Sequence, residues 1–143
     1  MSQDNVKVVR SLYEYYGRKD IEAAAALVSD DFEWVVMPFG QTVTGQEGFK
    51  QMFGGFGIPF PDSTINVKNS VDGGDCVVME YDFAGTHNGP LTTPAGEIPA
   101  TGKPINIPGC EVYQLRHGKI VRLHTYFDVP TMMQQIGFMP SSA

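Results

Sequence analysis

Alternation of apolar and polar residues through the second half of the chain constrains the fold most strongly. Between residues 77 and 83 every second residue is apolar, which is the period of a strand with one buried face. A shorter run of the same kind covers residues 65–67, and Asp-Gly-Gly-Asp at 72–75 provides a turn between the two. The pattern therefore predicts an antiparallel hairpin.

Two longer runs further along the chain predict a second hairpin. Residues 105–115 and 119–128 both have strand character, and His117-Gly118 lies between them. A two-residue turn at this point places Arg116 opposite Lys119.

In the first 60 residues, apolar side chains recur mainly at helical spacing instead. Apolar positions predict a helix from Asp4 to Gly17, a second helix capped by Asp20, and a third after Thr44, where Thr-Gly-Gln-Glu has the form of a capping box. Residues 32–37 predict a strand between the second and third helices. Helices followed by a meandering sheet indicate an α+β fold with helices packed on a curved antiparallel sheet.

The size of the chain fits one domain over residues 1–143. Residues 87–104 are rich in glycine and proline, and a connection of this length is more often a functional loop or a lid than a plain link.

Charge and composition exclude several classes of partner. The chain has 16 acidic and 10 basic residues and a net charge of -6, with no basic cluster, which disfavours binding to nucleic acid. No apolar run approaches the length of about 20 residues that spans a bilayer, and no export signal is evident, so we expect a cytoplasmic protein without membrane contact. Cys76 and Cys110 are isolated, which is typical of buried reduced thiols.

Regular pairing across His117-Gly118 places Glu111 opposite His124 and gathers polar and aromatic residues on one face of the second hairpin. An acid, a phenol and a histidine within cross-strand reach can form an acid/base site, although a solvated face with an ordinary Glu111–His124 ion pair is the alternative. A bulge near Pro108 would exchange part of the two faces. The predicted row consists of Glu111, Tyr113, Arg122, His124, Tyr126 and Asp128.

Large apolar side chains from the first half of the chain predict an internal pocket between helices and sheet. Ligand pockets are mostly apolar with a few convergent polar groups, but an ordinary core has the same composition. The candidates are Tyr16, Trp34, Met37, Phe39, Met52, Phe53 and Phe56.

Several short motifs occur together in an order that resembles one known family. They are Gly85-Thr86-His87-Asn88-Gly89, Ala100-Thr101-Gly102-Lys103, Gly118-Lys119-Ile120, Asp128 and the early segment Asp30-Asp31-Phe32-Glu33-Trp34. With these motifs the chain resembles the SnoaL-like polyketide cyclases, an ester-cyclase group within the nuclear-transport-factor-2-like superfamily.

The resemblance implies a cone-shaped α+β barrel, a homodimer, and an internal pocket for a small apolar, carbonyl-bearing molecule, with no cofactor. We also expect no metal. It further implies that Asp128 acts as acid and base in an intramolecular aldol ring closure, with His87 at the pocket rim. His124 departs from the family pattern, in which an aromatic residue is expected. We expect His87 or His124 to help hold the enolate. Glu111, Tyr113 and Tyr126 are the predicted polar contacts to substrate.

Four alternatives remain open from the sequence. The same fold can serve a non-catalytic binder, or an enzyme like ketosteroid isomerase or epoxide hydrolase. A metal site from His87 and His124 with Glu111 or Asp128 has no supporting local ligand spacing. Asp128 before Val129-Pro130 also has the form of a helix N-cap, a role that does not exclude catalysis.

Overall fold

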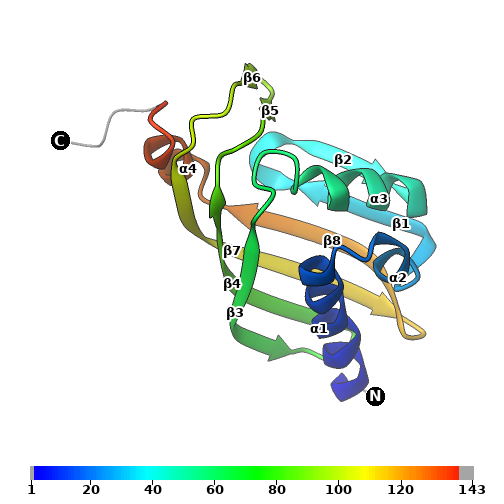
Figure 1. Cartoon of the computed structure of the whole chain (residues 1–143). Coiled ribbons are helices and arrows are strands. Elements are labelled where there is room, and N and C mark those ends of the chain that lie inside the picture. The colour runs from blue at the N-terminus through cyan, green and yellow to red at the C-terminus, as the bar shows by residue number, and fades with distance from the viewer. Residues whose placement is uncertain (1, 139–143) are drawn as a thin grey trace.

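The computed structural model describes residues 2–138 and has three helices on one face of a curved six-stranded sheet (Figure 1). The helices α1 (Ser2–Arg18), α2 (Ile21–Ala25) and α3 (Gly45–Gly55) pack on this face. In spatial order the strands are β2 (Gln41–Thr44), β1 (Val28–Val36), β8 (Lys119–Phe127), β7 (Pro104–Arg116), β4 (Cys76–Thr86) and β3 (Thr64–Asp72). The α+β cone predicted from the sequence is confirmed.

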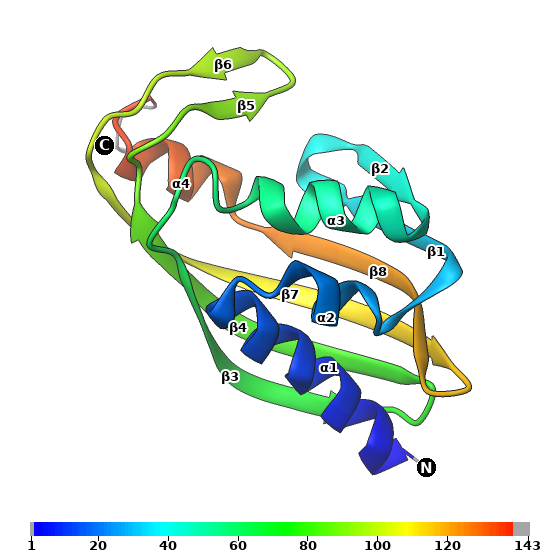
Figure 2. The same ribbon diagram turned by 45° about the vertical axis from the view of Figure 1, so that its right-hand side comes forward.

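Smaller elements gather beyond one end of the sheet, where β8 finishes (Figure 2). They are the 3-10 turn η1 (Met37–Phe39), the hairpin of β5 (Leu91–Thr93) and β6 (Gly96–Ile98), and the helix α4 (Val129–Gln135). The segment 87–104, expected as a loop, therefore contains a short hairpin of its own. Within residues 2–138 no helix is long and apolar enough to cross a membrane.

The helix boundaries follow local capping chemistry, with two differences from the prediction. The Asp20 carboxylate accepts a hydrogen bond from the Ala23 backbone N–H at 3.1 Å and caps α2 as expected. Asp4 lies inside the first turn of α1 rather than before it, because the helix already begins at Ser2. Thr44 is the N-cap residue of α3, but its side chain makes no capping hydrogen bond.

The sheet is mixed, which corrects the expectation of a purely antiparallel sheet. β1 and β8 run parallel, whereas the other neighbouring strands of this sheet are antiparallel. The reason is topological: the chain leaves β1 through β2 and α3, forms β3, β4 and β7 elsewhere, and returns beside β1 in the same direction. A parallel pair needs such a long connection.

The β7–β8 hairpin has the predicted tight turn but not the predicted register. His117 and Gly118 both have positive φ, and Arg116 pairs with Lys119. Beyond Ile120 one extra residue, Val121, forms a bulge in β8. The bulge places Ile120 and Leu123, both 1% exposed, on the same inner face. In a regular strand, residues three apart would point to opposite faces.

The shifted register changes the partner of Glu111. Glu111 pairs with Thr125, and His124 pairs with Val112 on the opposite face, so the predicted Glu111–His124 pair was wrong. A shift by one residue moves each later side chain of the strand to the other face.

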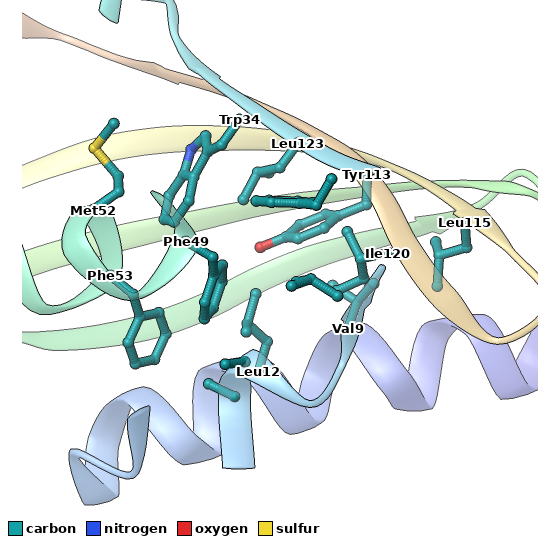
Figure 3. Packing of buried hydrophobic residues seen from close by; sticks show 14 of the residues in the cluster. Val9, Leu12, Trp34, Phe49, Met52, Phe53, Tyr113, Leu115, Ile120 and Leu123 are labelled. Atoms are coloured by element: carbon teal, nitrogen blue, oxygen red, sulfur yellow. The ribbon is translucent and has the colours of Figure 1, made fainter. Parts of the chain in front are cut away.

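The core lies between the helices and the inner face of the sheet (Figure 3). Phe49 of α3 is fully buried and contacts the rings of Phe32 and Trp34 at centroid distances of 5.7 and 5.6 Å. It also stacks on Phe53 at 5.1 Å. Aromatic side chains therefore hold α3 on β1 and form one wall of the space described next.

Candidate functional site

A cavity of about 300 Å³ lies between the helices and the inner face of the sheet. Its walls are mainly aromatic and aliphatic, as the sequence predicted. They include Tyr16, Trp34, Phe39, Met52, Phe53, Phe56, Phe60, Phe83, Leu123 and Phe127. The hairpin β5–β6 contributes Leu91 and Thr92, so the segment that was expected to be functional does border the cavity.

A buried carboxylate lines the cavity. Glu111 is 7% exposed, and its Oε1 accepts hydrogen bonds from the hydroxyls of Tyr13 and Tyr113, each at 2.8 Å. Its Oε2 accepts a hydrogen bond from the Thr125 hydroxyl at 2.7 Å. All four residues also line the cavity. The cluster joins α1, β7 and β8 at the centre of the inner face.

Trp34 supports this cluster from β1. Its indole Nε1–H donates to Thr125 Oγ1 at 2.9 Å. Because the indole can only donate, the threonine oxygen must accept, and its own proton is directed toward Glu111. The network therefore supplies three hydroxyl donors to one carboxylate.

Burial dominates the electrostatics of the cluster. Burial raises the pKa of Glu111, and the hydrogen bonds from Thr125, Tyr13 and Tyr113 only partly oppose the shift. Burial, followed by the nearby Glu111 charge, also raises the pKa values of Tyr13 and Tyr113, so both remain phenols that donate. A buried carboxylate of raised pKa holds a proton more readily than an exposed one, which suits it to accept and return a proton.

Charge is otherwise sparse around this space. Within residues 2–138 the cavity lining holds no lysine, arginine or histidine, and Glu111 is its one carboxyl group. A neutral, largely apolar molecule fits such a lining better than an anion does.

Asp128 lies at the start of α4 and does not line the cavity. Its Oδ1 accepts from the Thr131 backbone N–H at 3.1 Å, and its Oδ2 accepts from the Thr131 hydroxyl at 2.6 Å. The hydroxyl bond is the main cause that lowers the pKa of Asp128, and the backbone bond adds to it. The capping role is confirmed, whereas the acid/base role stays a prediction that this placement does not favour.

His87 is fully buried at the base of the β5–β6 hairpin and is not part of the cavity lining. Its Nδ1 lies 2.9 Å from Thr101 Oγ1 and accepts from the Thr101 backbone N–H at 3.3 Å. Its backbone N–H donates to the Lys103 carbonyl at 2.9 Å. Burial lowers the pKa of His87, although the Gly89 carbonyl opposes the shift. This geometry fits an anchor that ties the two ends of the hairpin together.

Three other predicted residues lie away from the cavity. His124 and Tyr126 project from the outer face of the sheet because of the bulge, and Tyr126 is 42% exposed. Met37, in η1, is 41% exposed and does not contribute to the lining. His124 and Glu111 thus point to opposite faces, and residues 2–138 contain no group of three or more potential metal-ligating side chains.

The predicted contacts Tyr16, Trp34, Phe53, Glu111 and Tyr113 do come together at the cavity. Sequence reasoning missed the partners of the carboxylate, chiefly Tyr13 and Thr125. Tyr13 lies within the helix predicted from Asp4 to Gly17, and 98 residues separate it from Glu111.

Comparisons with known proteins agree with this architecture. The SnoaL-like domain model matches residues 9–123. A proposed SnoaL-like polyketide cyclase from Jannaschia sp. CCS1 is 22% identical with a TM-score of 0.86, over 96% of this chain and 94% of that chain. IdmH, a proposed polyketide cyclase from Streptomyces antibioticus, is 26% identical with a TM-score of 0.77, over 93% and 98%.

A further similar structure holds a small molecule. It is a protein with a ketosteroid isomerase-like fold from Catenulispora acidiphila DSM 44928 in complex with trimethylamine, 18% identical with a TM-score of 0.77, over 95% of this chain and 96% of that chain. No functionally curated protein matches this chain.

Proposed function

Because the chain belongs to the SnoaL-like domain family, we propose that it is a cofactor-independent cyclase or isomerase in which Glu111 removes a proton next to a carbonyl group. The substrate is a small, apolar, carbonyl-bearing molecule of polyketide type, bound in the internal cavity. The family and its polyketide-cyclase neighbours support a reaction of the cyclase or isomerase type. The single observation that carries the role of Glu111 is its burial as the one carboxyl group, among residues 2–138, that lines a mainly apolar cavity.

The proposed reaction begins with Glu111 as the base. Its carboxylate takes a proton from the carbon beside the carbonyl, and the electrons of the broken C–H bond form the enolate. In a ring closure the enolate carbon attacks a second carbonyl of the same molecule, and the new alkoxide takes the proton back from Glu111. Proton transfer by a positioned side chain typically contributes about 10²–10⁴-fold to the rate.

The hydrogen bonds around Glu111 suit both of its protonation states. Oε1 already accepts from two phenols, while Oε2 accepts from Thr125 alone among residues 2–138. A carboxylate oxygen has two acceptor sites, so Oε2 retains one for the incoming proton. Asp128 offers a weaker alternative, because both of its oxygens are engaged by Thr131 outside the cavity lining.

Proton exchange in heavy water tests this function without knowledge of the natural substrate. 2-Tetralone is a compact bicyclic ketone with acidic protons beside its carbonyl, and it is small enough for a cavity of about 300 Å³. We expect the protein to accelerate deuterium incorporation at these carbons above the buffer rate, measured by proton NMR. Binding of 2-tetralone without accelerated exchange would contradict the enzyme and support a non-catalytic binder of the same fold.

We also propose that the protein is a homodimer that pairs through the outer face of its sheet. A row of side chains crosses this face, formed by Val35, His124, Val112, Val78 and Val71. The four valines are half-buried or exposed, with Val71 49% exposed, and an apolar stripe of this kind is typical of a contact surface.

Light scattering after size exclusion is expected to give twice the 15.7 kDa mass of the chain at micromolar concentration. Val112→Lys, at the centre of the stripe, is expected to shift the protein to monomer because an unpaired ammonium would be buried at the interface. A wild-type monomer under these conditions would refute the dimer.

A further inference from the structure

Four phenols line the cavity, and three of them have hydrogen-bond partners within the protein. Tyr13 and Tyr113 donate to Glu111, and the Tyr16 hydroxyl lies 2.7 Å from Ser63 Oγ. Tyr81 is only 6% exposed, yet its hydroxyl has no partner among residues 2–138. Buried hydroxyls are normally hydrogen-bonded, because leaving one unpaired costs free energy.

The Tyr81 hydroxyl is not sealed inside the protein. Among residues 2–138 the one fully enclosed side-chain polar atom without a partner is Nε2 of His87. The Tyr81 hydroxyl oxygen therefore retains some accessible surface, and Tyr81 belongs to the lining of the cavity. A molecule in the cavity can supply the missing acceptor.

The backbone opposite Tyr81 makes room for its phenol end. Tyr81 on β4 pairs with Gly109 on β7. A Cβ atom at Gly109 would lie 2.6 Å from Cε1 and Cζ of Tyr81 and 2.7 Å from its hydroxyl oxygen. Glycine within a strand weakens it and often marks close approach of another group. Here it allows the phenol to lie against the strand that carries Glu111.

Tyr81 and the carboxylate border the same part of the cavity. Glu111 is two residues beyond Gly109 on β7 and so shares its face. The Tyr81 ring is 6.1 Å from the ring of Tyr13, whose hydroxyl donates to Glu111. Burial, followed by the Glu111 charge, raises the pKa of Tyr81, which keeps its proton available for donation.

We propose that the Tyr81 hydroxyl donates a hydrogen bond to the carbonyl oxygen of the substrate while Glu111 removes the proton from the adjacent carbon. This inference rests on the proposed function and adds the group that receives the developing negative charge. As the C–H electrons form the carbon–carbon double bond, the carbonyl π electrons move onto the oxygen, where Tyr81 stabilises them. Removal of one such donor typically lowers turnover about 10²–10³-fold.

Tyr81→Phe tests the role because it removes only the hydroxyl. The probe is 2-naphthol, which has the shape of the enol of 2-tetralone and a fluorescence that reports proton donation by its own hydroxyl. We expect 2-naphthol to bind Tyr81→Phe about 5- to 10-fold more weakly than wild type, the effect of one lost hydrogen bond. Deuterium exchange into 2-tetralone is expected to fall about 10²–10³-fold with a much smaller change in KM.

Stability separates this role from a structural one. Since the hydroxyl has no partner among residues 2–138, Tyr81→Phe is expected to resist urea as well as wild type does, or better. Tyr15→Phe, on α1 and outside the cavity lining, is the matched control and is expected to keep 2-naphthol affinity within about twofold, as for a change away from the site.

Each outcome decides between the two proposals. Unchanged 2-naphthol affinity and exchange in Tyr81→Phe, with exchange lost in Glu111→Gln, would overturn the role of Tyr81 alone. A marked loss of stability in Tyr81→Phe would also overturn it, because the hydroxyl would then have a partner inside the protein. Wild-type protein that neither binds 2-naphthol nor exchanges 2-tetralone would overturn the proposed function and this inference together.

Discussion

Glu111→Gln is expected to lower deuterium exchange into 2-tetralone by about 10²–10⁴-fold, the usual contribution of a general base. Glutamine has nearly the same size, and its amide oxygen can still accept from Tyr13 and Tyr113. It cannot take up a proton at the working pH. Affinity for 2-naphthol is therefore expected to change much less than the exchange rate, which NMR and fluorescence titration measure separately.

Asp128→Asn separates the two candidate bases in the same assay. Asparagine caps a helix about as well as aspartate does, so this variant is expected to keep both the fold and the exchange rate. If Asp128→Asn loses exchange and Glu111→Gln keeps it, Asp128 rather than Glu111 is the base.

The pH dependence of exchange follows from the raised pKa of Glu111. Only the ionised carboxylate acts as a base, so the rate is expected to rise with pH and level off above the raised pKa, a step that Glu111→Gln removes.

The contribution of Glu111 to stability is expected to fall as the pH rises. Because the folded state holds this proton more tightly than the unfolded state, the contribution of Glu111 to the free energy of unfolding is largest below the ordinary glutamate pKa. It is lost as pH rises through the raised value.

Phe49→Ala is expected to lower the free energy of unfolding by about 3–5 kcal/mol, the range for deleting a buried aromatic ring. Phe49 is fully buried and contacts three other rings that connect α3 to β1. Its removal leaves a void that these stiff neighbours cannot fill completely. Urea unfolding followed by circular dichroism measures the change.

Phe138→Ala provides the matched control, because Phe138 is 53% exposed. A surface substitution of this kind is expected to change the free energy of unfolding by no more than about 0.5 kcal/mol. Similar losses in the two variants would contradict the packing described for α3.

Local patterns predicted most of the fold because local chemistry decides most of it. The alternation along β4 and the positive-φ turn at His117 and Gly118 led directly to the two hairpins. The Asp20 and Asp128 caps marked the starts of α2 and α4 for the same reason. The parallel pairing of β1 with β8 was missed, because no local pattern records which distant strand becomes a neighbour.

The candidate site was predicted less completely because one inserted residue decides which side chains face the cavity. Glu111 and Tyr113 follow the simple alternation of β7, and both were identified. On β8 the same alternation selected His124 and Tyr126, whereas the bulge at Val121 presents Thr125 instead. Alternation alone gives no sign of such a bulge, and a polar residue after it is equally compatible with either face.

The bulge at Val121 also bears on how sites diverge between relatives of this fold. Deletion of the Val121 codon would remove the bulge but leave Glu111 opposite Thr125, because all pairs beyond the bulge already share one register. Regular pairing of Val121 with Gln114, with no residue removed, would instead place His124 opposite Glu111 and exchange a hydroxyl for an imidazole beside the buried acid. Chains that share the same β8 residues can therefore differ in chemistry through the presence or absence of one bulge, which residue identities alone do not reveal.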